Sequence, residues 1–314
     1  MPDTGVSALT PQMRDVLERL LREDAGLPDP TTLPAGEGRA LAERTNRRWN
    51  VDLPAMAEVR DVGLASGMAG RVLVPANDEG RGAILYIHGG GWAFCSKETH
   101  ERAARVLAIA AGAPVVTFDH RSAPEHPYPE GLDDCIAAWQ ALGSIFPNRR
   151  LGVAGDSSGA NLAVAATLRL QAEKGRAPDV GLLFYGVYDD DFYSPSYRLY
   201  AEGPGLTRAK MQRYWAWYQP VPARRSDPLI SPLKASDSAL RALPPLYLIA
   251  AGLDPLRSDS ERFHARLSAL GRADTLRIFE GVVHGFMQMS NVLSDALTAT
   301  EEAGAAFRKA VNTK

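Results

Sequence analysis

The stretch Leu151-Gly152-Val153-Ala154-Gly155-Asp156-Ser157-Ser158-Gly159-Ala160-Asn161-Leu162 decides how the chain is organised. A short apolar run stops at Gly155, and a helix-compatible run starts just after Gly159. Between them lies Gly155-x-Ser157-x-Gly159, the spacing of a strand–turn–helix elbow that presents a serine hydroxyl. Glycine on both sides avoids Cβ clashes in so tight a turn. Because Gly and Ser are common, the pattern alone decides little, and the rest of the chain must supply a base, an acid and an oxyanion site.

Length and composition indicate an ordinary globular protein. The 314 residues suffice for one large α/β domain or two smaller ones. A hydrophobic content of 45% and a charged content of 23% are typical of such proteins. The net charge of −2 gives no electrostatic reason to expect binding to nucleic acid or to an anionic membrane. Three arginine pairs are interpreted as solvated surface: Arg47-Arg48, Arg149-Arg150 and Arg224-Arg225.

The sequence predicts a cytoplasmic protein. Residues 1–7 have no basic start and no apolar core of signal-peptide length. The apolar stretches at 180–187 and 246–253 are too short to span a bilayer. The two cysteines, Cys95 and Cys135, do not make a disulfide framework, so a reducing compartment is expected.

Apolar runs alternate with helix-compatible segments from residue 83 onward, which favours a parallel sheet with crossover helices. The expected strands are 83–87, 114–118, 151–154, 180–185, 246–251 and 275–279, preceded by an antiparallel pair within 57–75 that is split at Ser66-Gly67. The expected helices are 9–26, 40–49, 99–111, 131–142, 160–170, 207–218, 259–270 and 292–311.

We expect a single domain, 1–314, with a cap. Residues 188–237 break the alternation, because they are rich in aromatics, prolines and acids and contain one clear helix. An insertion at this point predicts a lid over the carboxyl edge of the sheet, where open α/β sheets bind ligands. The N-terminal helices carry no chemistry of their own and are either a lid or a packing arm.

A glycine-rich loop, His88-Gly89-Gly90-Gly91-Trp92, follows the strand at 83–87. Three glycines let backbone N–H groups approach an oxyanion without interference from side chains. Gly89, Gly90 and the residue after the elbow serine, Ser158, are the predicted donors. The alternative, a phosphate-binding or merely tight loop, has little support because the Gly-Lys-Ser/Thr and dinucleotide spacings are missing.

A serine nucleophile needs a base that a carboxylate orients, and in elbow enzymes the order is Ser, Asp or Glu, then His. Asp254 follows the strand at 246–251, and His284 follows the last strand. Asp259 is the main rival to Asp254, whereas the place of Asp156 inside the elbow favours a structural role.

Structural or surface roles are expected for the other histidines, namely His88, which would brace the glycine loop, and His100, His120, His126 and His264. No pair of them has metal-ligand spacing, and the acidic run 189–191 is more typical of a solvated loop. No metal site is therefore predicted.

Taken together, these motifs resemble the bacterial hormone-sensitive-lipase-like family of α/β hydrolases, the acetyl esterase and carboxylesterase group. The resemblance runs from residue 83 to 286 and rests on segments 88–92, 119–127, 155–159, 194–197, 227–233, 254–256 and 284–286. The chain departs from the family pattern at Cys95, His120, Ser122, Ser158 and Ala160, and none of these removes a catalytic group.

The resemblance implies an α/β-hydrolase fold, a mostly parallel central sheet flanked by helices. It also implies a helical cap from residues 1–50 and the insertion 188–237. The implied activity is hydrolysis of short-chain carboxylic esters without a cofactor. Ser157 would be the nucleophile, His284 the general base and Asp254 its orienter, with Gly89, Gly90 and Ser158 as oxyanion donors.

Substrate choice stays open at the level of the sequence. Five aromatic residues are candidates for a substrate pocket, although core packing is the commoner role: Trp92, Tyr185, Tyr188, Trp215 and Phe286. An amidase or formamidase would use the same triad. A ligand-binding protein on this fold is disfavoured because His284 is present. The expected partner is a small ester, and the family's frequent dimers make a homodimer an expectation.

Overall fold

The fold is built on an eight-stranded sheet with the order β1-β2-β4-β3-β5-β6-β7-β8. The computed structural model describes residues 8–64 and 67–312, so residues 1–7, on which the export prediction rests, and Ser66 of the predicted strand break lie outside the described residues. The strands are β1 (Glu58–Gly63), β2 (Ala69–Val74), β3 (Gly82–Ile87), β4 (Val115–Phe118), β5 (Arg150–Asp156), β6 (Val180–Phe184), β7 (Leu246–Leu253) and β8 (Thr275–Val283).

Helices connect these strands in the alternation that the sequence predicts. The helices are α1 (Pro11–Glu23), α2 (Ala35–Asn46), α3 (Glu101–Ala111), α4 (Glu130–Ile145), α5 (Ser158–Ala172), α6 (Pro195–Leu199), α7 (Arg208–Tyr218), α8 (Asp237–Arg241), α9 (Arg257–Ala269) and α10 (Ser294–Asn312). Strand β2 pairs antiparallel with β1 and β4, and every other neighbouring pair is parallel. The predicted α/β-hydrolase fold with a mostly parallel sheet is confirmed.

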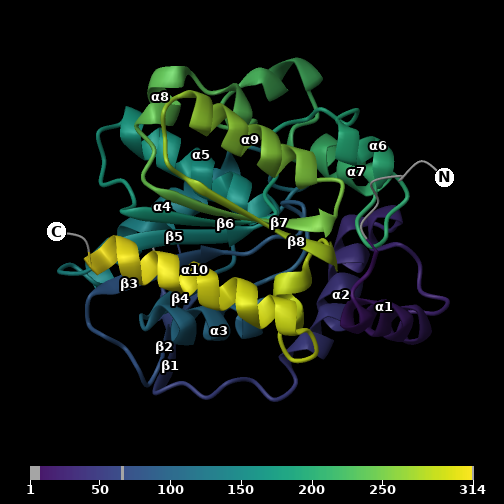
Figure 1. Cartoon of the computed structure of the whole chain (residues 1–314), viewed down its shortest axis with the longest axis horizontal. Helices are drawn as coiled ribbons and strands as arrows, with labels where there is room; N and C mark the ends of the chain where they lie inside the picture. The colour runs from purple at the N-terminus through teal and green to yellow at the C-terminus, as the bar shows by residue number, and fades with distance from the viewer. Residues whose placement is uncertain (1–7, 65–66, 313–314) are drawn as a thin grey trace.

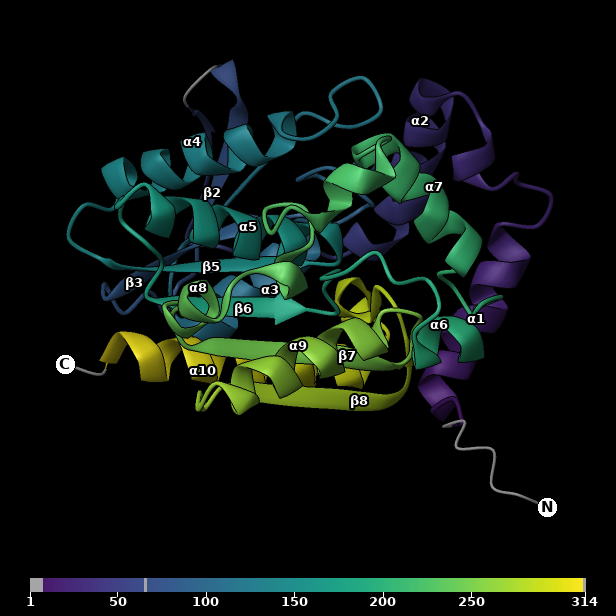
Figure 2. The same ribbon diagram turned by 90° about the horizontal axis from the view of Figure 1, so that it is seen from above.

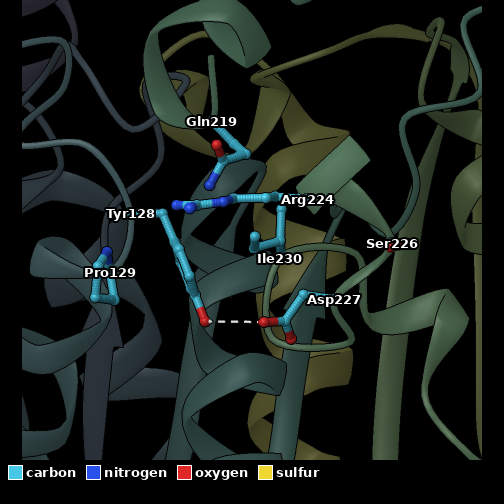
Figure 3. Close-up of a pocket in the computed structure, with 7 residues that line it drawn as sticks. All are labelled: Tyr128, Pro129, Gln219, Arg224, Ser226, Asp227 and Ile230. Atoms are coloured by element: carbon cyan, nitrogen blue, oxygen red, sulfur yellow. Dashed lines mark hydrogen bonds between the residues drawn. The ribbon is translucent and has the colours of Figure 1, made fainter. Parts of the chain in front are cut away.

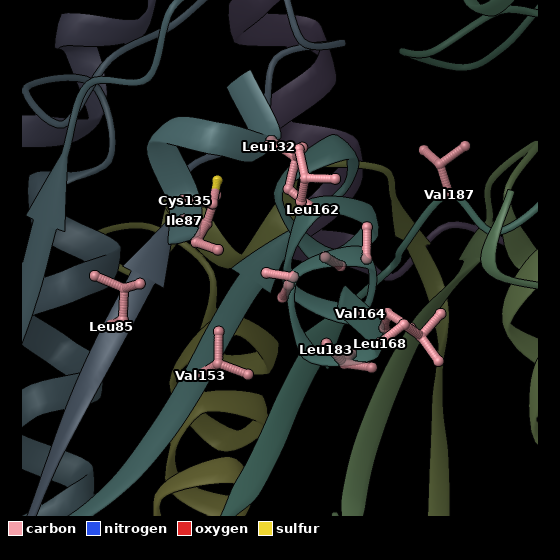
Figure 4. Packing of buried hydrophobic residues seen from close by; sticks show 14 of the residues in the cluster. Leu85, Ile87, Leu132, Cys135, Val153, Leu162, Val164, Leu168, Leu183 and Val187 are labelled. Carbon is pink, nitrogen blue, oxygen red and sulfur yellow. The ribbon is translucent and has the colours of Figure 1, made fainter. Parts of the chain in front are cut away.

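Both faces of the central strands are covered, which explains why their sequences are continuously apolar. In β3, Leu85 and Ile87 point into the cluster under α4 and α5, part of which Figure 4 shows. The alternate residues Ile84 and Tyr86 point into the opposite cluster, which α3 and α10 close. In Figure 1, α4, α5 and α9 lie above the sheet, and α3 and α10 lie below it.

Four of the described helices outside the alternation gather at one end of the sheet. In both views α1, α2, α6 and α7 lie beyond the end toward which the strand arrows point (Figures 1 and 2). Segments from before β1 and after β6 therefore come together at the carboxyl edge. None of the described helices combines the length and the apolar character that a membrane crossing requires.

The second helix differs from its prediction of residues 40–49. It begins at Ala35, directly after Pro34, and Arg47–Asn50 form a separate 3-10 turn, η2. Glycines at 36 and 38 lower helix propensity and obscure this start. Gly38 is nevertheless required, because a Cβ there would lie 2.2 Å from the carbonyl oxygen of Pro30. Close packing, which local propensity does not encode, sets the boundary.

Candidate active site

The elbow forms where the sequence predicts it, between β5 and α5. Ser157 has φ of 54° and ψ of −121°, a backbone conformation that L-residues rarely adopt. A Cβ on Gly159 would lie 2.0 Å from the carbonyl oxygen of Ile87, and a Cβ on Gly155 would lie 2.5 Å from Gly159. Both glycines are therefore sterically necessary. The turn places Ser157 as the N-cap of α5, where the helix dipole favours negative charge.

Three residues from three strand ends meet at this turn. The Nε2 atom of His284 lies 3.0 Å from Ser157 Oγ, and its Nδ1 atom lies 2.7 Å from Asp254 Oδ2. Asp254 is fully buried, and its Oδ1 accepts from the Leu256 N–H at 2.9 Å. The ring of Tyr185 packs edge-on against the His284 imidazole, with 4.8 Å between centroids. The carboxylate can accept from Nδ1–H, which leaves Nε2 as a base toward the serine.

The other two carboxylates considered from the sequence serve neighbouring segments. Asp156 Oδ1 accepts from Tyr86 OH at 2.9 Å and from the Gly89 N–H at 3.0 Å. Asp259 Oδ2 accepts from the N–H groups of Tyr188 and Asp189, at 2.7 and 3.0 Å. Asp156 thus fixes the glycine loop to the elbow, and Asp259 fixes the loop that follows β6.

The contact with Asp156 bears on the predicted oxyanion donors. An N–H group has one proton, and that of Gly89 is already donated to the carboxylate of Asp156. The Gly89 N–H is therefore already engaged, which favours the next two glycines of the loop as donors. Gly91, with φ of 63°, packs against the ring of Tyr214, where a Cβ would lie 2.4 Å from ring atoms. The Ser158 hydroxyl accepts from the Trp92 N–H at 3.1 Å and is fully buried.

The five aromatic residues proposed for a pocket are all buried in the core. Trp92 stacks on Tyr218 with 4.3 Å between centroids and meets Trp215 edge-on. Tyr188 stacks on Phe263 of α9. Phe286 packs against Tyr185 and is likewise inaccessible. Large rings fill the space between elements by packing on one another, and these side chains shape the core around the site.

A cavity of about 210 Å³ does lie beside His284. Its lining comes mainly from the N-terminal segment: Leu20, Asp24, Thr45, Asn46, Arg48, Trp49, His284, Gly285, Gln288 and Met289. The sequence pattern indicates no chemistry for this segment and predicts a solvated Arg48. The Arg48 side chain is in fact 12% exposed and paired with Glu23 and Asp24. No spacing in the sequence brings these residues to His284.

A larger cavity of about 480 Å³ lies elsewhere, between the loop before α4 and the segment after α7. Figure 3 shows Tyr128, Arg224 and Asp227 around it, with the Tyr128 hydroxyl 3.4 Å from Asp227 Oδ2. It contains none of the three residues of the Ser157 arrangement. Chemistry rather than volume therefore identifies the candidate site. Within residues 8–64 and 67–312, no group of three or more His, Cys, Asp or Glu side chains could hold a metal ion.

Two histidines form a buried stack beneath the glycine loop. His88 and His120 lie parallel with 4.5 Å between centroids, and His88 Nδ1 donates to the carbonyl oxygen of Gly89 at 2.8 Å. Burial lowers the pKa of His88 to about 3 and also lowers the pKa of His120. The folded protein therefore binds these protons more weakly than the unfolded chain does.

This stack predicts acid sensitivity of the fold. A buried histidine with a lowered pKa contributes to the free energy of unfolding at pH values above its ordinary pKa of 6.5. This contribution is lost as the pH falls from 6.5 toward the pKa of the folded protein. Replacing His120 by Phe keeps a ring on His88 and removes one buried titrating group. Between about pH 7.5 and about pH 5 the thermal midpoint of both proteins should fall. We expect the fall to be smaller in His120→Phe than in the wild type, by roughly 2–4 °C.

A matched control is the exposed histidine of the same segment, His126, whose side chain is 46% exposed. His126→Gln should show the same acid-induced drop in midpoint as the wild type. An equal drop in all three proteins would show that the buried stack does not carry the pH dependence.

Comparison with known proteins agrees with this geometry. The sequence model of a family described as alpha/beta hydrolase fold matches residues 84–288. The chain is 32% identical over 300 residues to carboxylesterase NlhH of Mycobacterium tuberculosis, covering 90% of this chain and 93% of that one. It is 35% identical over 222 residues to an ethyl acetate hydrolase of Pseudomonas putida, covering 68% and 69%.

Solved structures agree as well. The ester-hydrolase EH1AB1 from the metagenome of Lake Arreo, solved in complex with a derivative of bipyridine phosphonate, superposes with a TM-score of 0.89. It is 32% identical in sequence, and the match covers 97% of this chain and 100% of that one.

Proposed function

Because this chain belongs to the hormone-sensitive-lipase-like family of α/β hydrolases and is a carboxylic ester hydrolase, we propose that it cleaves short-chain carboxylic esters through an acyl-enzyme on Ser157. The observation that carries the proposal is the hydrogen-bonded series Asp254–His284–Ser157, with distances of 2.7 and 3.0 Å. Each member follows a different strand of the sheet, so the series is held by the rigid part of the fold.

In this mechanism Ser157 Oγ attacks the ester carbonyl carbon while His284 Nε2 takes the hydroxyl proton. His284 then returns that proton to the leaving alcohol, and the acyl group stays on Ser157. A water molecule, activated by the same imidazole, releases the acid. Asp254 holds the ring and stabilises the imidazolium. The carbonyl oxygen, negative in both tetrahedral intermediates, accepts from the N–H groups of Gly90, Gly91 and Ser158.

The helices at the carboxyl edge support the expected cap. Helices α1 and α2, from residues 1–50, and α6 and α7, from the insertion 188–237, lie together over this end of the sheet (Figure 2). They would form one domain, 1–314, with the sheet. The cavity of about 210 Å³ is below the roughly 300–1,000 Å³ of sites for drug-sized ligands, which favours short substrates. The homodimer stays a prediction.

One experiment tests the proposal. A series of 4-nitrophenyl esters from acetyl to lauroyl should show kcat/KM highest for acyl chains of about two to six carbons and at least about tenfold lower for lauroyl, because the buried rings of Tyr185 and Phe286 pack beside His284 and leave little room for a long acyl chain. Acetanilide, the matched amide, should be cleaved at least about a thousandfold more slowly than phenyl acetate, since amine departure is harder.

A fluorophosphonate probe should label one serine per chain, and the labelled peptide should carry Ser157. Comparable rates on acetanilide and phenyl acetate would favour the amidase alternative. A maximum at lauroyl would overturn the assignment of short-chain esters.

A further inference from the structure

The cavity beside His284 has walls that suit a particular class of substrate. The apolar lining comes from Leu20, Trp49 and Met289, and the polar lining includes Asp24, Thr45 and Arg48. A pocket for an alkyl chain would have little use for the charged groups of this wall, because their unused hydrogen-bonding capacity would lose water without gaining a partner.

Asp24 and Arg48 are the two charged groups of this wall, and they are paired with each other. The Arg48 guanidinium donates to the Thr45 carbonyl, to Glu23 at 2.8 Å and to Asp24. These contacts use three of its five N–H groups, which leaves two for a ligand oxygen. Asp24 uses Oδ1 for the pair, and Oδ2 has no hydrogen-bond partner among the described residues. The unused N–H groups of Arg48 and the free acceptor Oδ2 of Asp24 therefore lie side by side at the cavity.

This combination matches a hydroxyl group, which donates one hydrogen bond and accepts others. The hydroxyl proton would go to Asp24 Oδ2, and the oxygen would accept from Arg48. A methyl group in that place offers neither bond.

The position of the cavity assigns this hydroxyl to one half of the ester. His284 lines the cavity, and in the proposed function His284 Nε2 protonates the leaving alkoxide. The alcohol half must therefore pass over the imidazole, whereas the acyl half stays on Ser157. Resting on the proposed function, we infer that the cavity walled by Asp24 and Arg48 is a subsite for a hydroxylated alcohol half, and that the enzyme prefers monoesters of short diols and polyols.

Three acetates of similar size test this inference. Wild-type kcat/KM should be about tenfold higher for 2-hydroxyethyl acetate than for propyl acetate, the size expected for one net hydrogen bond to a charged group. For 2-methoxyethyl acetate, which cannot donate, kcat/KM should be close to that for propyl acetate. Asp24→Ala should bring the ratio of the hydroxyethyl to the propyl ester close to one.

The matched control is the neighbouring carboxylate, Glu23. It also pairs with Arg48, and its side chain is 39% exposed against 38% for Asp24, but it does not line the cavity. Glu23→Ala should keep the tenfold ratio. A structural effect of losing one ion pair with Arg48 would instead change the ratio equally in both variants and would overturn the subsite.

Two further outcomes separate the inference from the proposed function. Equal Ser157-dependent hydrolysis of hydroxyethyl and propyl acetate would overturn the subsite and leave the esterase mechanism in place. A second pair of substrates carries the hydroxyl on the acyl half: ethyl 3-hydroxybutyrate and ethyl 3-methylbutyrate. If Asp24→Ala loses a preference for the first of these and keeps the wild-type ratio of hydroxyethyl to propyl acetate, the assignment to the alcohol half is overturned. If Ser157→Ala hydrolyses both acetates as fast as the wild type, the proposed function itself fails.

Discussion

Ser157→Ala is expected to lower kcat for a 4-nitrophenyl ester by at least about 10⁴-fold. The hydroxyl of Ser157 is the one that lies 3.0 Å from His284 Nε2, so its loss removes the attacking atom. Oxyanion donors and substrate binding would remain and would account for the residual rate. Among the described residues the Ser157 hydroxyl hydrogen-bonds only to His284, and alanine differs from serine by that hydroxyl alone, so the thermal midpoint should stay within about 2 °C of the wild type.

The adjacent serine provides the control. Ser158→Ala removes a hydroxyl that accepts from the Trp92 N–H at 3.1 Å, but it keeps the backbone N–H assigned to the oxyanion. Its kcat should fall by less than about tenfold. Steady-state rates of both variants, with fluorophosphonate labelling, assign the nucleophile. A larger loss in Ser158→Ala than in Ser157→Ala would refute the assignment.

Much of the fold could be predicted because the sheet is parallel and covered on both faces. Strands such as β3 and β6 are continuously apolar, and the segments between successive parallel strands are long enough for a crossover helix. The start of α2 was missed because it depends on a tertiary contact, that of Gly38 with Pro30. The short helices α6 and α8, of five residues each, are held by their surroundings and carry no periodicity of their own.

The site residues also fall into those with a local signature in the sequence and those that depend on tertiary contacts. Residues that need a special backbone or a fixed order along the chain leave a signature, as Ser157 does between its two glycines. Residues that act through distant contacts do not. The hydrogen bond from Gly89 to Asp156 spans 67 positions and could not be read from the glycine run. Asp24 and Arg48 meet His284 across more than 230 positions, so neither the cavity nor its polarity was predictable.

Asp254→Asn is expected to lower kcat by about 10³–10⁴-fold. Asp254 Oδ2 lies 2.7 Å from His284 Nδ1, and a carboxylate there keeps the proton on Nδ1. An asparagine can turn its NH₂ toward Nδ1, which then becomes the acceptor and moves the proton to Nε2. His284 would donate to Ser157 instead of accepting its proton, and the imidazolium would lose its counter-charge. Rates measured from about pH 6 to about pH 9 should partly recover toward high pH, where Ser157 loses its proton more readily.

The control for this variant is the rival carboxyl group, Asp259. Burial raises the pKa of Asp259 to about 8, so its neutral form predominates at pH 7. Asparagine reproduces a neutral group that accepts from the N–H groups of Tyr188 and Asp189. Asp259→Asn should therefore keep kcat within about fivefold of the wild type. Its stability should also decline less between about pH 4 and about pH 8, since a carboxyl group with a raised pKa loses its stabilising contribution as pH rises from the ordinary value to the folded value. If kcat falls strongly in Asp259→Asn and is retained in Asp254→Asn, then Asp259 and not Asp254 orients His284. That result would require the His284 ring to turn toward α9.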